Sequence, residues 1–329
     1  MIHADAGPFE GWGHLRESIE IARALRDRGT QCLLALPSEQ PEAQREVQDA
    51  GFAVALVPAS DWQQGSFPAR LMAVVEEQYA TMVISDLVHV NAGYAQAMDQ
   101  AKIKWATVTE IADEEVANIN FNLCTSPEYV PLNSSYRKPA SHVVRDNIRQ
   151  ILICYGGSDP RNVTGKTLNW LRAGLDTKEL DASISVVVVL GPLFTEAETI
   201  LKQANEFPVD VVVRESILPA ELADAAALSD IAITTSGGTM YEFSALGLPC
   251  VVVPILPKHV INAQVLERRG VVLRTDLHDR ISALDLISAI QQLGPREKRA
   301  AMSYAAQHEI DGMGAARIAD RLAEEWGLE

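Results

Sequence analysis

Basic residues are scarce in this chain of 329 residues: 28 lysines and arginines stand against 44 acidic residues, which gives a formal net charge of −16 at pH 7. A nucleic-acid-binding surface needs clustered lysine and arginine, so this balance argues against a nucleic-acid partner. A small phosphate site is still allowed, because backbone amides and one or two cations can form it. No apolar run reaches about 18 residues, so we expect no transmembrane segment.

Cysteine and aromatic residues are also few. The four cysteines are scattered, without a CxxC pair or a Cys/His cluster at zinc spacing. We therefore expect reduced structural thiols, no metal site, and a cytoplasmic protein without a secretory leader. Aromatic residues make up only 6% of the chain while hydrophobic residues make up 47%, so Val, Ile, Leu and Ala must build the cores, as in buried parallel strands.

Short apolar runs alternate with helical segments, which is the pattern of an α/β protein. In the first half we expect a short initial strand and strands over 31–37, 52–58, 81–86 and 104–110. In the second half we expect strands over 150–157, 184–191, 209–215, 230–238, 249–255 and 271–276. Helices fill the intervals, and the last forty residues are expected to be helical with a break near 311–314.

A polar, irregular stretch over 133–148 separates the two series of strands. We therefore expect an N-terminal Rossmann-like domain over 1–140 and a C-terminal Rossmann-like domain over 147–310. The remaining residues, 311–329, are expected to form a helix that packs back toward the N-terminal domain. Ligands of doubly wound sheets bind beyond the carboxyl ends of the strands, so the cleft between the two domains is where chemistry is expected.

The loop "ADAGPFEGWGHLR" (4–16) follows the first expected strand and runs into a helix. Gly11 and Gly13 can adopt backbone conformations and close approaches that a Cβ would block. His14 and Arg16 open the helix, where free N–H groups and the macrodipole favour anions. A histidine there would stay neutral near pH 7 and could act as a base. The alternative is a solvent-exposed histidine at a helix start.

The loop "CYGGSDPRNVTGK" (154–166) also joins a strand to a helix. It begins with two glycines and a serine, Gly156, Gly157 and Ser158. Paired glycines followed by polar residues predict a cradle for a phosphate or a sugar, although the Walker A spacing is absent. The alternative is a tight turn in which Asn162 or Thr164 caps the helix.

The stretch "ITTSGGTMYEFSALGLPCVVVP" (233–254) is the richest in the chain. Hydroxyls and exposed amides gather there at a helix start, from Thr235, Ser236, Gly237, Gly238 and Thr239. This combination predicts a diphosphate site. Glu242 follows in the first helical turn and could accept hydrogen bonds from a ribose diol, although a glutamate there also complements the helix dipole.

Several weaker candidates lie elsewhere. Asp5 and Asp86 each end an expected strand, where a carboxylate can orient water or sugar hydroxyls or cap the next helix. Lys258 and His259 are slightly stronger candidates for a binding site, because they follow a strand in the same half as the predicted diphosphate loop. His259 and four other histidines lie in no constellation and are expected at the surface or in the linker: His89, His142, His259, His278 and His308.

These loops, taken in order, resemble one protein family. The stretches that carry the likeness are "HADAGPFEGWGHLRESIEIARALRDRG", "SPEYVPLNSSYRK" (126–138), "ILICYGGSDPRNVT", "ALSDIAITTSGGTMYEFSALGLPCVVVP" and "MSYAAQHEIDGMGAARI" (302–318). They resemble the UDP-sugar hydrolases of pseudaminic acid biosynthesis and their spore-coat polysaccharide relatives. The resemblance implies a GT-B fold, with two doubly wound Rossmann-like domains facing an inter-domain cleft, akin to the glycosyltransferase MurG and without metal or cofactor.

The resemblance also implies cleavage by water of the bond between the anomeric carbon and UDP. His14 matches the family histidine thought to act on that water, and Asp5 matches the aspartate after the first strand; we take both as catalytic. The residues expected to bind the rest of the substrate are Gly11, Trp12, Gly13, Arg16, Asp86, Gly156, Gly157, Ser158, Asn262 and Gln264. Those expected to bind UDP are Ser236, Gly237, Gly238, Thr239 and Glu242.

Two departures from the family leave the exact reaction open. Trp12 stands where the family has a small residue and would reshape a sugar pocket. The family's Asn-Gln dipeptide is replaced by Asn262 and Gln264 with one residue between them, a spacing nearer to that of MurG-like transferases. The alternatives are therefore a GT-B glycosyltransferase and a catalytically degenerate nucleotide-sugar-binding protein. We expect a UDP-sugar substrate and a monomer or weak homo-oligomer.

Overall fold

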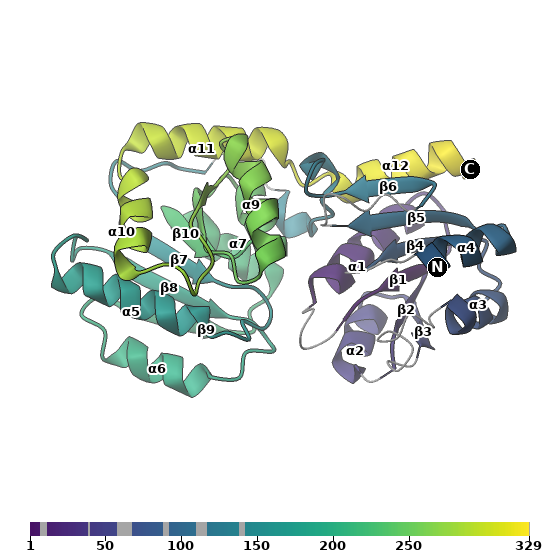
Figure 1. Ribbon diagram of the computed structural model, residues 1–329, viewed down its shortest axis with the longest axis horizontal. Coiled ribbons are helices and arrows are strands. Elements are labelled where there is room, and N and C mark those ends of the chain that lie inside the picture. The colour runs from purple at the N-terminus through teal and green to yellow at the C-terminus, as the bar shows by residue number, and fades with distance from the viewer. Residues whose placement is uncertain are drawn as a thin grey trace. The chain divides into compact units, whose positions relative to one another are not determined.

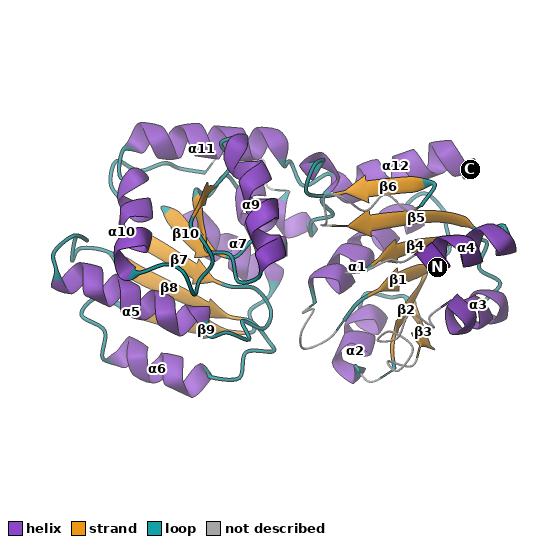
Figure 2. Cartoon of the chain, viewed as in Figure 1, coloured by secondary structure: helices purple, strands orange, loops and turns teal. Residues whose placement is uncertain are grey.

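The computed structural model describes residues 1–6, 12–38, 40–57, 68–87, 92–109, 117–137 and 142–328. The chain divides into two compact units, Met1–Leu132 with Met313–Glu329 and Asn133–Gly312. Each unit contains a six-stranded parallel sheet with helices packed beside it (Figures 1 and 2). The predicted α/β class with two doubly wound sheets is thereby confirmed. No helix among the described residues combines the length and the apolar character needed to cross a membrane.

The sheet of the first unit has the strand order β3-β2-β1-β4-β5-β6. Its strands are β1 (Ile2–Ala4), β2 (Leu33–Pro37), β3 (Ala53–Val57), β4 (Met82–Asp86), β5 (Lys104–Thr109) and β6 (Ile119–Asn122). Its helices are α1 (Gly13–Arg26), α2 (Pro41–Asp49), α3 (Pro68–Glu77), α4 (Ala92–Ala101), α12 (Gly314–Trp326) and the 3₁₀ turn η2 (Pro127–Tyr129). The strand order reverses between β1 and β4, and ligands of such sheets bind where the order reverses.

The sheet of the second unit has the order β12-β11-β10-β7-β8-β9. Its strands are β7 (Gln150–Cys154), β8 (Ser185–Leu190), β9 (Val211–Glu215), β10 (Ile231–Thr234), β11 (Cys250–Val252) and β12 (Leu273–Arg274). Its helices are η3 (Ser134–Tyr136), α5 (Val163–Asp176), α6 (Ala197–Asn205), α7 (Pro219–Leu228), α8 (Gly238–Ala245), α9 (Pro257–Arg268), α10 (Ala283–Gln292) and α11 (Arg296–Glu309). Here the order reverses between β7 and β10.

Strand β6 was not predicted from the sequence. It lies at the edge of the sheet and pairs only with β5 among the described strands. Two asparagines interrupt its apolar pattern, and both bind nearby groups: Asn120 Oδ1 accepts from Thr107 Oγ1 at 2.7 Å, and Asn122 Oδ1 accepts from the Cys124 amide at 3.1 Å. These bonds satisfy polar groups that would otherwise argue against a strand. Several predicted strands are also shorter than expected: β7 ends at Cys154 and β10 at Thr234, while β11 spans only Cys250–Val252 and β12 only Leu273–Arg274.

Helix α12 belongs to the first unit, where it packs against α1. Arg28, two residues after the end of α1, has its Nη2 2.6 Å from Asp320 Oδ1 of α12, and its Nη1 donates to the Ala24 carbonyl oxygen of α1 at 2.8 Å. At the start of α12, a Cβ on Gly314 would lie 2.2 Å from the carbonyl oxygen of Val130, so only glycine allows this approach. The glycine-rich break near 311–314 therefore has a packing role.

The polar stretch over 133–148 is bound to the second unit over part of its length. The Arg299 side chain of α11 is fully buried, and its Nη2 donates to the carbonyl oxygens of Arg145 at 2.7 Å and Asp146 at 3.1 Å. Asp230 Oδ2 accepts from the Arg149 amide at 2.7 Å. Buried charged groups of this kind hold a segment in one place because each needs its partners.

A chain of buried polar groups runs through the core of the first unit. His3 Nδ1 lies 2.7 Å from the Tyr94 hydroxyl, which in turn lies 2.8 Å from Ser85 Oγ. Ser85 Oγ also accepts from Trp105 Nε1 at 3.0 Å. Burial lowers the pKa of His3 to about 3, so its imidazole is neutral in the folded protein at any mild pH.

The buried His3 should make folding stability sensitive to acid. Its pKa is about 3 when folded against 6.5 for an unperturbed histidine, so between these values the unfolded chain binds a proton that the folded chain does not. The free energy of unfolding should therefore fall with acidification, by about 1.4 kcal/mol per pH unit from this group alone. We expect a His3→Gln variant to show a slope smaller by that amount between pH 6 and 4 in urea denaturation.

Candidate functional site

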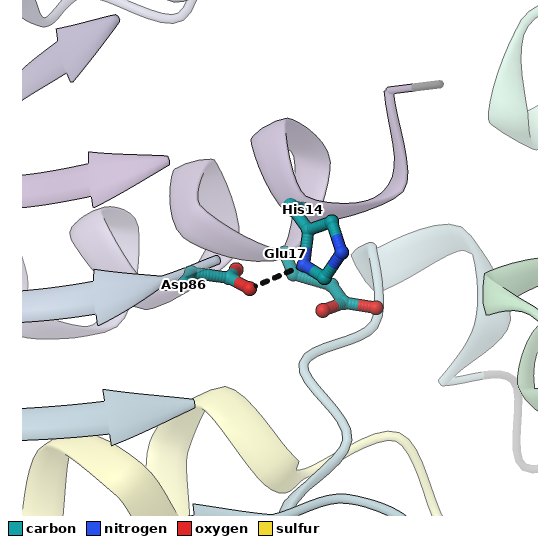
Figure 3. Close-up of side chains that lie close together, drawn as sticks. All are labelled: His14, Glu17 and Asp86. Atoms are coloured by element: carbon teal, nitrogen blue, oxygen red, sulfur yellow. Dashed lines mark hydrogen bonds and ion pairs between the residues drawn. The ribbon is translucent and has the colours of Figure 1, made fainter. Parts of the chain in front are cut away.

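A histidine and an aspartate form a close pair where the strand order of the first unit reverses. His14 lies in the first turn of α1, and Asp86 is the last residue of β4. The His14 Nδ1 atom lies 2.6 Å from Asp86 Oδ1 (Figure 3). The Asp86 side chain has no exposed surface, whereas the His14 side chain keeps 10% of its surface exposed. The histidine is therefore the member of the pair that a ligand can reach.

The helical repeat of α1 turns two further polar residues to the same side as His14. Ser18 Oγ donates to Asp86 Oδ2 at 3.1 Å, so both carboxylate oxygens of Asp86 are engaged. The Glu17 carboxylate lies beside the imidazole (Figure 3). Neither Glu17 nor Ser18 was predicted from the sequence. Their positions three and four residues after His14, which share one helix face, were the signal that could have identified them.

The pair has the arrangement of an oriented general base. In the neutral tautomer in which His14 Nδ1 donates to the Asp86 carboxylate, Nε2 carries the lone pair. Figure 3 shows the second ring nitrogen pointing away from Asp86. A buried carboxylate behind a histidine fixes the ring orientation and stabilises the imidazolium that forms when the histidine takes up a proton. The site can therefore remove a proton from a hydroxyl group placed at Nε2.

The carboxylate that meets His14 is Asp86, whereas Asp5 was the aspartate predicted to be catalytic. The Asp5 amide donates to the Asp86 carbonyl oxygen at 3.1 Å. Burial raises the pKa of the Tyr94 hydroxyl, and the charge of Asp5 adds to this increase. Asp5 comes directly after β1, which ends at Ala4, and its catalytic role stays a prediction.

Two other residues predicted in the entry loop, Trp12 and Arg16, contact neighbouring side chains. The Arg16 guanidinium lies 5.9 Å from the centroid of the Trp12 ring, and its Nε donates to Glu46 Oε1 at 3.1 Å. A Cβ on Gly13 would meet no atom within 4 Å, so close approach does not explain this glycine. Gly11 lies outside the described residues.

His14, Glu17 and Asp86 offer ligand atoms that lie within 4.8 Å of one another, so they could hold a metal ion. The direct hydrogen bond between His14 and Asp86 already uses one nitrogen and one oxygen of this set. A cation would therefore compete with the hydrogen-bonded pair. Zinc is the cation to consider, because it prefers imidazole and carboxylate ligands.

We expect turnover to survive metal removal and to fall when zinc is added. The reason is that zinc binding would consume the base that the pair provides. The measurement is the initial rate after treatment with EDTA, with and without added zinc, for the wild type and for Glu17→Gln, which should be less sensitive to zinc. Loss of activity with EDTA and its recovery with zinc would instead identify a metal-dependent enzyme.

In the second unit, the loops after β7, β8 and β10 converge. Cys154 of β7 pairs in register with Thr234 of β10, so both loops leave the same edge of the sheet. Gly156 has φ +83°, a conformation that favours glycine, and a Cβ there would lie 3.8 Å from Thr239 Oγ1. A Cβ on Gly191, after β8, would lie 2.3 Å from the Gly156 carbonyl oxygen. The structure thus brings the predicted glycine loop beside the predicted diphosphate loop.

The predicted diphosphate loop opens helix α8. Gly237 occupies the N-cap position in an extended conformation, and no side chain caps the helix among the described residues. The first amides of a helix lack partners within it, so such an end is suited to an anion. Ser236 is buried, while Gly237, Gly238 and Thr239 are half-buried. Glu242 is half-buried and is the fifth residue of α8. It therefore lies just beyond the first helical turn, in which it was predicted.

Asp159 is the residue that shapes the glycine loop, and it was not selected from the sequence. Its carboxylate accepts hydrogen bonds from the Val163 amide at 2.9 Å, the Thr164 amide at 2.8 Å and the Thr164 hydroxyl at 2.7 Å. Burial raises its pKa, and the hydrogen bonds from Thr164 and Val163 oppose the increase. Asn162 caps α5 as the alternative interpretation held, since its Oδ1 accepts from the Gly165 amide at 2.9 Å. The GGSDP segment therefore carries a helix-capping structure, and Ser158 is half-buried within it.

Removing the Asp159 carboxylate should destabilise the protein. Asp159→Ala would leave three donors at the start of α5 without their acceptor, and we expect a loss of about 2 kcal/mol in the free energy of unfolding. Chemical denaturation measures this loss. Asp159→Asn keeps one acceptor oxygen and should lose about half as much; equal stability of the alanine variant and the wild type would contradict the capping role.

The β11–α9 connection carries the remaining candidates. Asn262 is buried in α9 and Gln264 is half-buried, and their spacing of two residues turns them to different sides of the helix. His259 Nδ1 lies 3.2 Å from Thr235 Oγ1, so His259 of α9 contacts the predicted diphosphate loop. Burial, followed by the charge of Lys258, lowers the pKa of His259 to about 4.

Among the other histidines, the expectation of a surface or linker position was wrong for His278. It is 7% exposed, and its Nδ1 lies 3.1 Å from Lys166 Nζ. His142 is half-buried, and burial lowers its pKa to about 4. His308 is exposed and stacks on Tyr304. His89 lies outside the described residues.

No family model matches the chain. The spore coat polysaccharide biosynthesis protein SpsG of Bacillus subtilis is 20% identical over 339 residues, which cover 96% of this chain and 95% of that protein. An uncharacterised protein of Methanocaldococcus jannaschii is 24% identical over 283 residues, which cover 76% of this chain and about half, 54%, of that protein.

Solved structures resemble the chain over nearly its whole length. MurG of Acinetobacter baumannii superposes with a TM-score of 0.72 at 16% identity, covering 98% of both chains. The spinosyn rhamnosyltransferase SpnG with spinosyn aglycone superposes with a TM-score of 0.68 at 16% identity, covering 99% of both chains. The same transferase has been solved with thymidine diphosphate, again with a TM-score of 0.68. Together with the two doubly wound sheets, these likenesses show that the chain has the GT-B fold of glycosyltransferases.

Proposed function

We propose that the protein cleaves a nucleoside diphosphate sugar at its anomeric carbon, with His14 as the general base. The observation that carries this proposal is the 2.6 Å hydrogen bond between His14 Nδ1 and the buried Asp86 carboxylate. The pair occupies the position where ligands of doubly wound sheets bind. In this proposal the first unit supplies the base and the second unit holds the nucleotide.

The reaction follows from the chemistry of the pair. Nε2 of His14 takes the proton of the attacking hydroxyl, the oxygen attacks the anomeric carbon, and the bond from that carbon to the diphosphate oxygen breaks. Asp86 stabilises the imidazolium formed in the same step. A positioned general base contributes about 10²–10⁴-fold to such reactions.

The diphosphate is proposed to bind at the start of α8. The uncapped amides after Gly237 and the hydroxyl of Thr239 offer donors to phosphate oxygens. Gly156 brings the second loop within reach of Thr239, which supports a shared site. Glu242 is proposed to accept hydrogen bonds from the ribose hydroxyls. A structural relative solved with thymidine diphosphate supports a nucleotide ligand for this fold.

We propose water as the attacking group and a UDP-linked amino or deoxy sugar as the substrate, in biosynthesis of a nonulosonic acid such as pseudaminic acid or of a surface polysaccharide. The resemblance of the loop sequences to UDP-sugar hydrolases and the likeness to a spore coat polysaccharide biosynthesis protein support this choice. We also propose a cytoplasmic location, because the four cysteines are scattered in the sequence without a pairing motif.

Glycosyl transfer to an acceptor hydroxyl is the second candidate. It is favoured by the GT-B structures that resemble this chain, which include MurG and a rhamnosyltransferase. The spacing of Asn262 and Gln264 supports the same candidate. The same base would serve both reactions, because each begins with the loss of a proton from a hydroxyl.

The deciding experiment incubates the protein with a panel of UDP-linked amino sugars in the absence of any acceptor. Formation of UDP and free sugar at a catalytic rate supports the hydrolase. UDP release that requires an added acceptor supports the transferase. Tight nucleotide binding without turnover on any donor would support a catalytically degenerate binding protein. A thermal-shift screen with UDP, CMP, GDP and dTDP sugars tests the nucleotide, and stabilisation by CMP or GDP donors alone would overturn the choice of UDP.

A further inference from the structure

Two hydrogen bonds join His259 to the loop between β10 and α8. The imidazole Nδ1 lies 3.2 Å from Thr235 Oγ1, and the backbone carbonyl oxygen of His259 accepts from Ser236 Oγ at 2.7 Å. Thr235 is 7% exposed and Ser236 is 1% exposed, so both contacts are shielded from water. The start of α9 is thereby fastened to successive residues of this loop.

Few contacts within the loop itself hold its backbone in place. Gly237 is extended, and a Cβ there would meet no atom within 4 Å, so local packing does not hold this residue. Within the loop, the Gly237 amide donates to the Thr235 carbonyl oxygen at 3.1 Å, and the Met240 amide donates to the Gly237 carbonyl oxygen at 2.9 Å. A glycine-containing loop of this kind has many alternative conformations to lose when it becomes ordered. Its shape therefore depends on contacts from outside, and His259 supplies two.

We propose that His259 is a positioning residue whose imidazole, through Thr235, holds the Thr235–Gly237 backbone in the shape that receives the diphosphate. This inference rests on the proposed function. His259 increases the affinity for the nucleotide by holding the loop, whereas His14 transfers the proton. The imidazole itself does not touch the diphosphate. Burial and the neighbouring Lys258 lower the pKa of His259 to about 4 and keep it neutral near pH 7, so the bond to Thr235 is the same across the physiological range.

The two ring nitrogens of His259 can be tested separately. An asparagine amide reaches the position of Nδ1, whereas a glutamine amide reaches the position of Nε2. If His259 acts by holding Thr235, His259→Asn should behave like the wild type, and His259→Gln should behave like His259→Ala. If Nε2 instead contacts the ligand, the order of the two variants reverses. The exposed His308 provides the matched control, His308→Ala, in the same unit.

The first measurement is UDP affinity by calorimetry. Loss of one shielded hydrogen bond in a loop predicts an increase of about five- to tenfold in the dissociation constant for the alanine and glutamine variants. The asparagine variant should stay within about twofold of the wild type by the same argument. With a nucleotide-sugar substrate, the change should fall on KM, with kcat little altered, because the base on the other unit is intact.

The second measurement uses the protein without any ligand. Hydrogen exchange at the Gly237 and Met240 amides should be faster in His259→Ala and His259→Gln than in the wild type, and unchanged in His259→Asn. Unchanged exchange in the alanine variant would overturn the inference, as would retained UDP affinity in the glutamine variant with loss in the asparagine variant. If the wild type does not bind UDP, the proposed function fails, while the exchange data still decide whether His259 holds the loop.

Discussion

Replacing His14 with asparagine is expected to lower kcat on the nucleotide-sugar substrate by about 10²–10⁴-fold, the usual contribution of a general base. The asparagine amide can occupy the place of Nδ1 and keep the hydrogen bond to Asp86, while Nε2 and its lone pair are lost. The fold should therefore survive, and the loss of rate would report the missing base. The measurement is steady-state kinetics together with UDP affinity, which should stay within about twofold because the nucleotide site is proposed in the other unit.

A matched substitution at His308, an exposed histidine of α11, controls for the loss of a histidine as such. We expect His308→Asn to keep wild-type kcat and KM. Wild-type turnover in His14→Asn would remove His14 from the mechanism, and an equal loss of turnover and UDP affinity would indicate a change in the folded structure.

Replacing Asp86 with asparagine should lower kcat by about 10³–10⁴-fold, because the pair then favours the wrong tautomer. The amide of asparagine can donate to Nδ1, which moves the histidine proton to Nε2 and leaves no base at the exposed side of the ring. The variant also loses the negative charge that stabilises the imidazolium. Ser18→Ala, which removes the hydroxyl bonded to Asp86 Oδ2, should reduce kcat by a few fold only, since it leaves the carboxylate in place.

The two residues should act as a unit. If Asp86 works through His14, the double variant His14→Asn/Asp86→Asn should be no slower than His14→Asn alone. Losses that multiply across the two sites would show that Asp86 acts independently of the histidine, for instance by contacting the substrate, and would contradict its role as the partner that orients His14.

The sequence was sufficient to predict most strands of the two sheets. Runs such as 184–191 and 81–86 are buried in parallel sheets, and burial on both faces requires the continuous apolar pattern that identified them. Prediction failed where polar residues satisfy one another locally. Strand β6 contains Asn120 and Asn122, whose side chains bind neighbouring groups, and no apolar pattern indicates a strand there.

The site was predictable only in part, for a physical reason. His14 could be selected from its place at a helix start, but its partner could not, because Asp86 lies 72 residues away and meets it only through the pairing of β1 with β4. Asp5 is nearer in sequence, yet the hydrogen bond of His14 Nδ1 goes to Asp86. His259 and Thr235 are likewise joined only by the pairing of β10 with β11. Strand order and register decide these contacts, and one sequence does not display them.

The most direct test of the central claim is the fate of the oxygen atom when a UDP-linked amino sugar is turned over in ¹⁸O-labelled water. Attack at the anomeric carbon by a water molecule that His14 activates predicts the label in the free sugar and none in UDP. The same assay with His14→Asn should show almost no product. Label in the UDP, which means attack at phosphorus, or an unchanged rate in the variant would contradict the proposed mechanism.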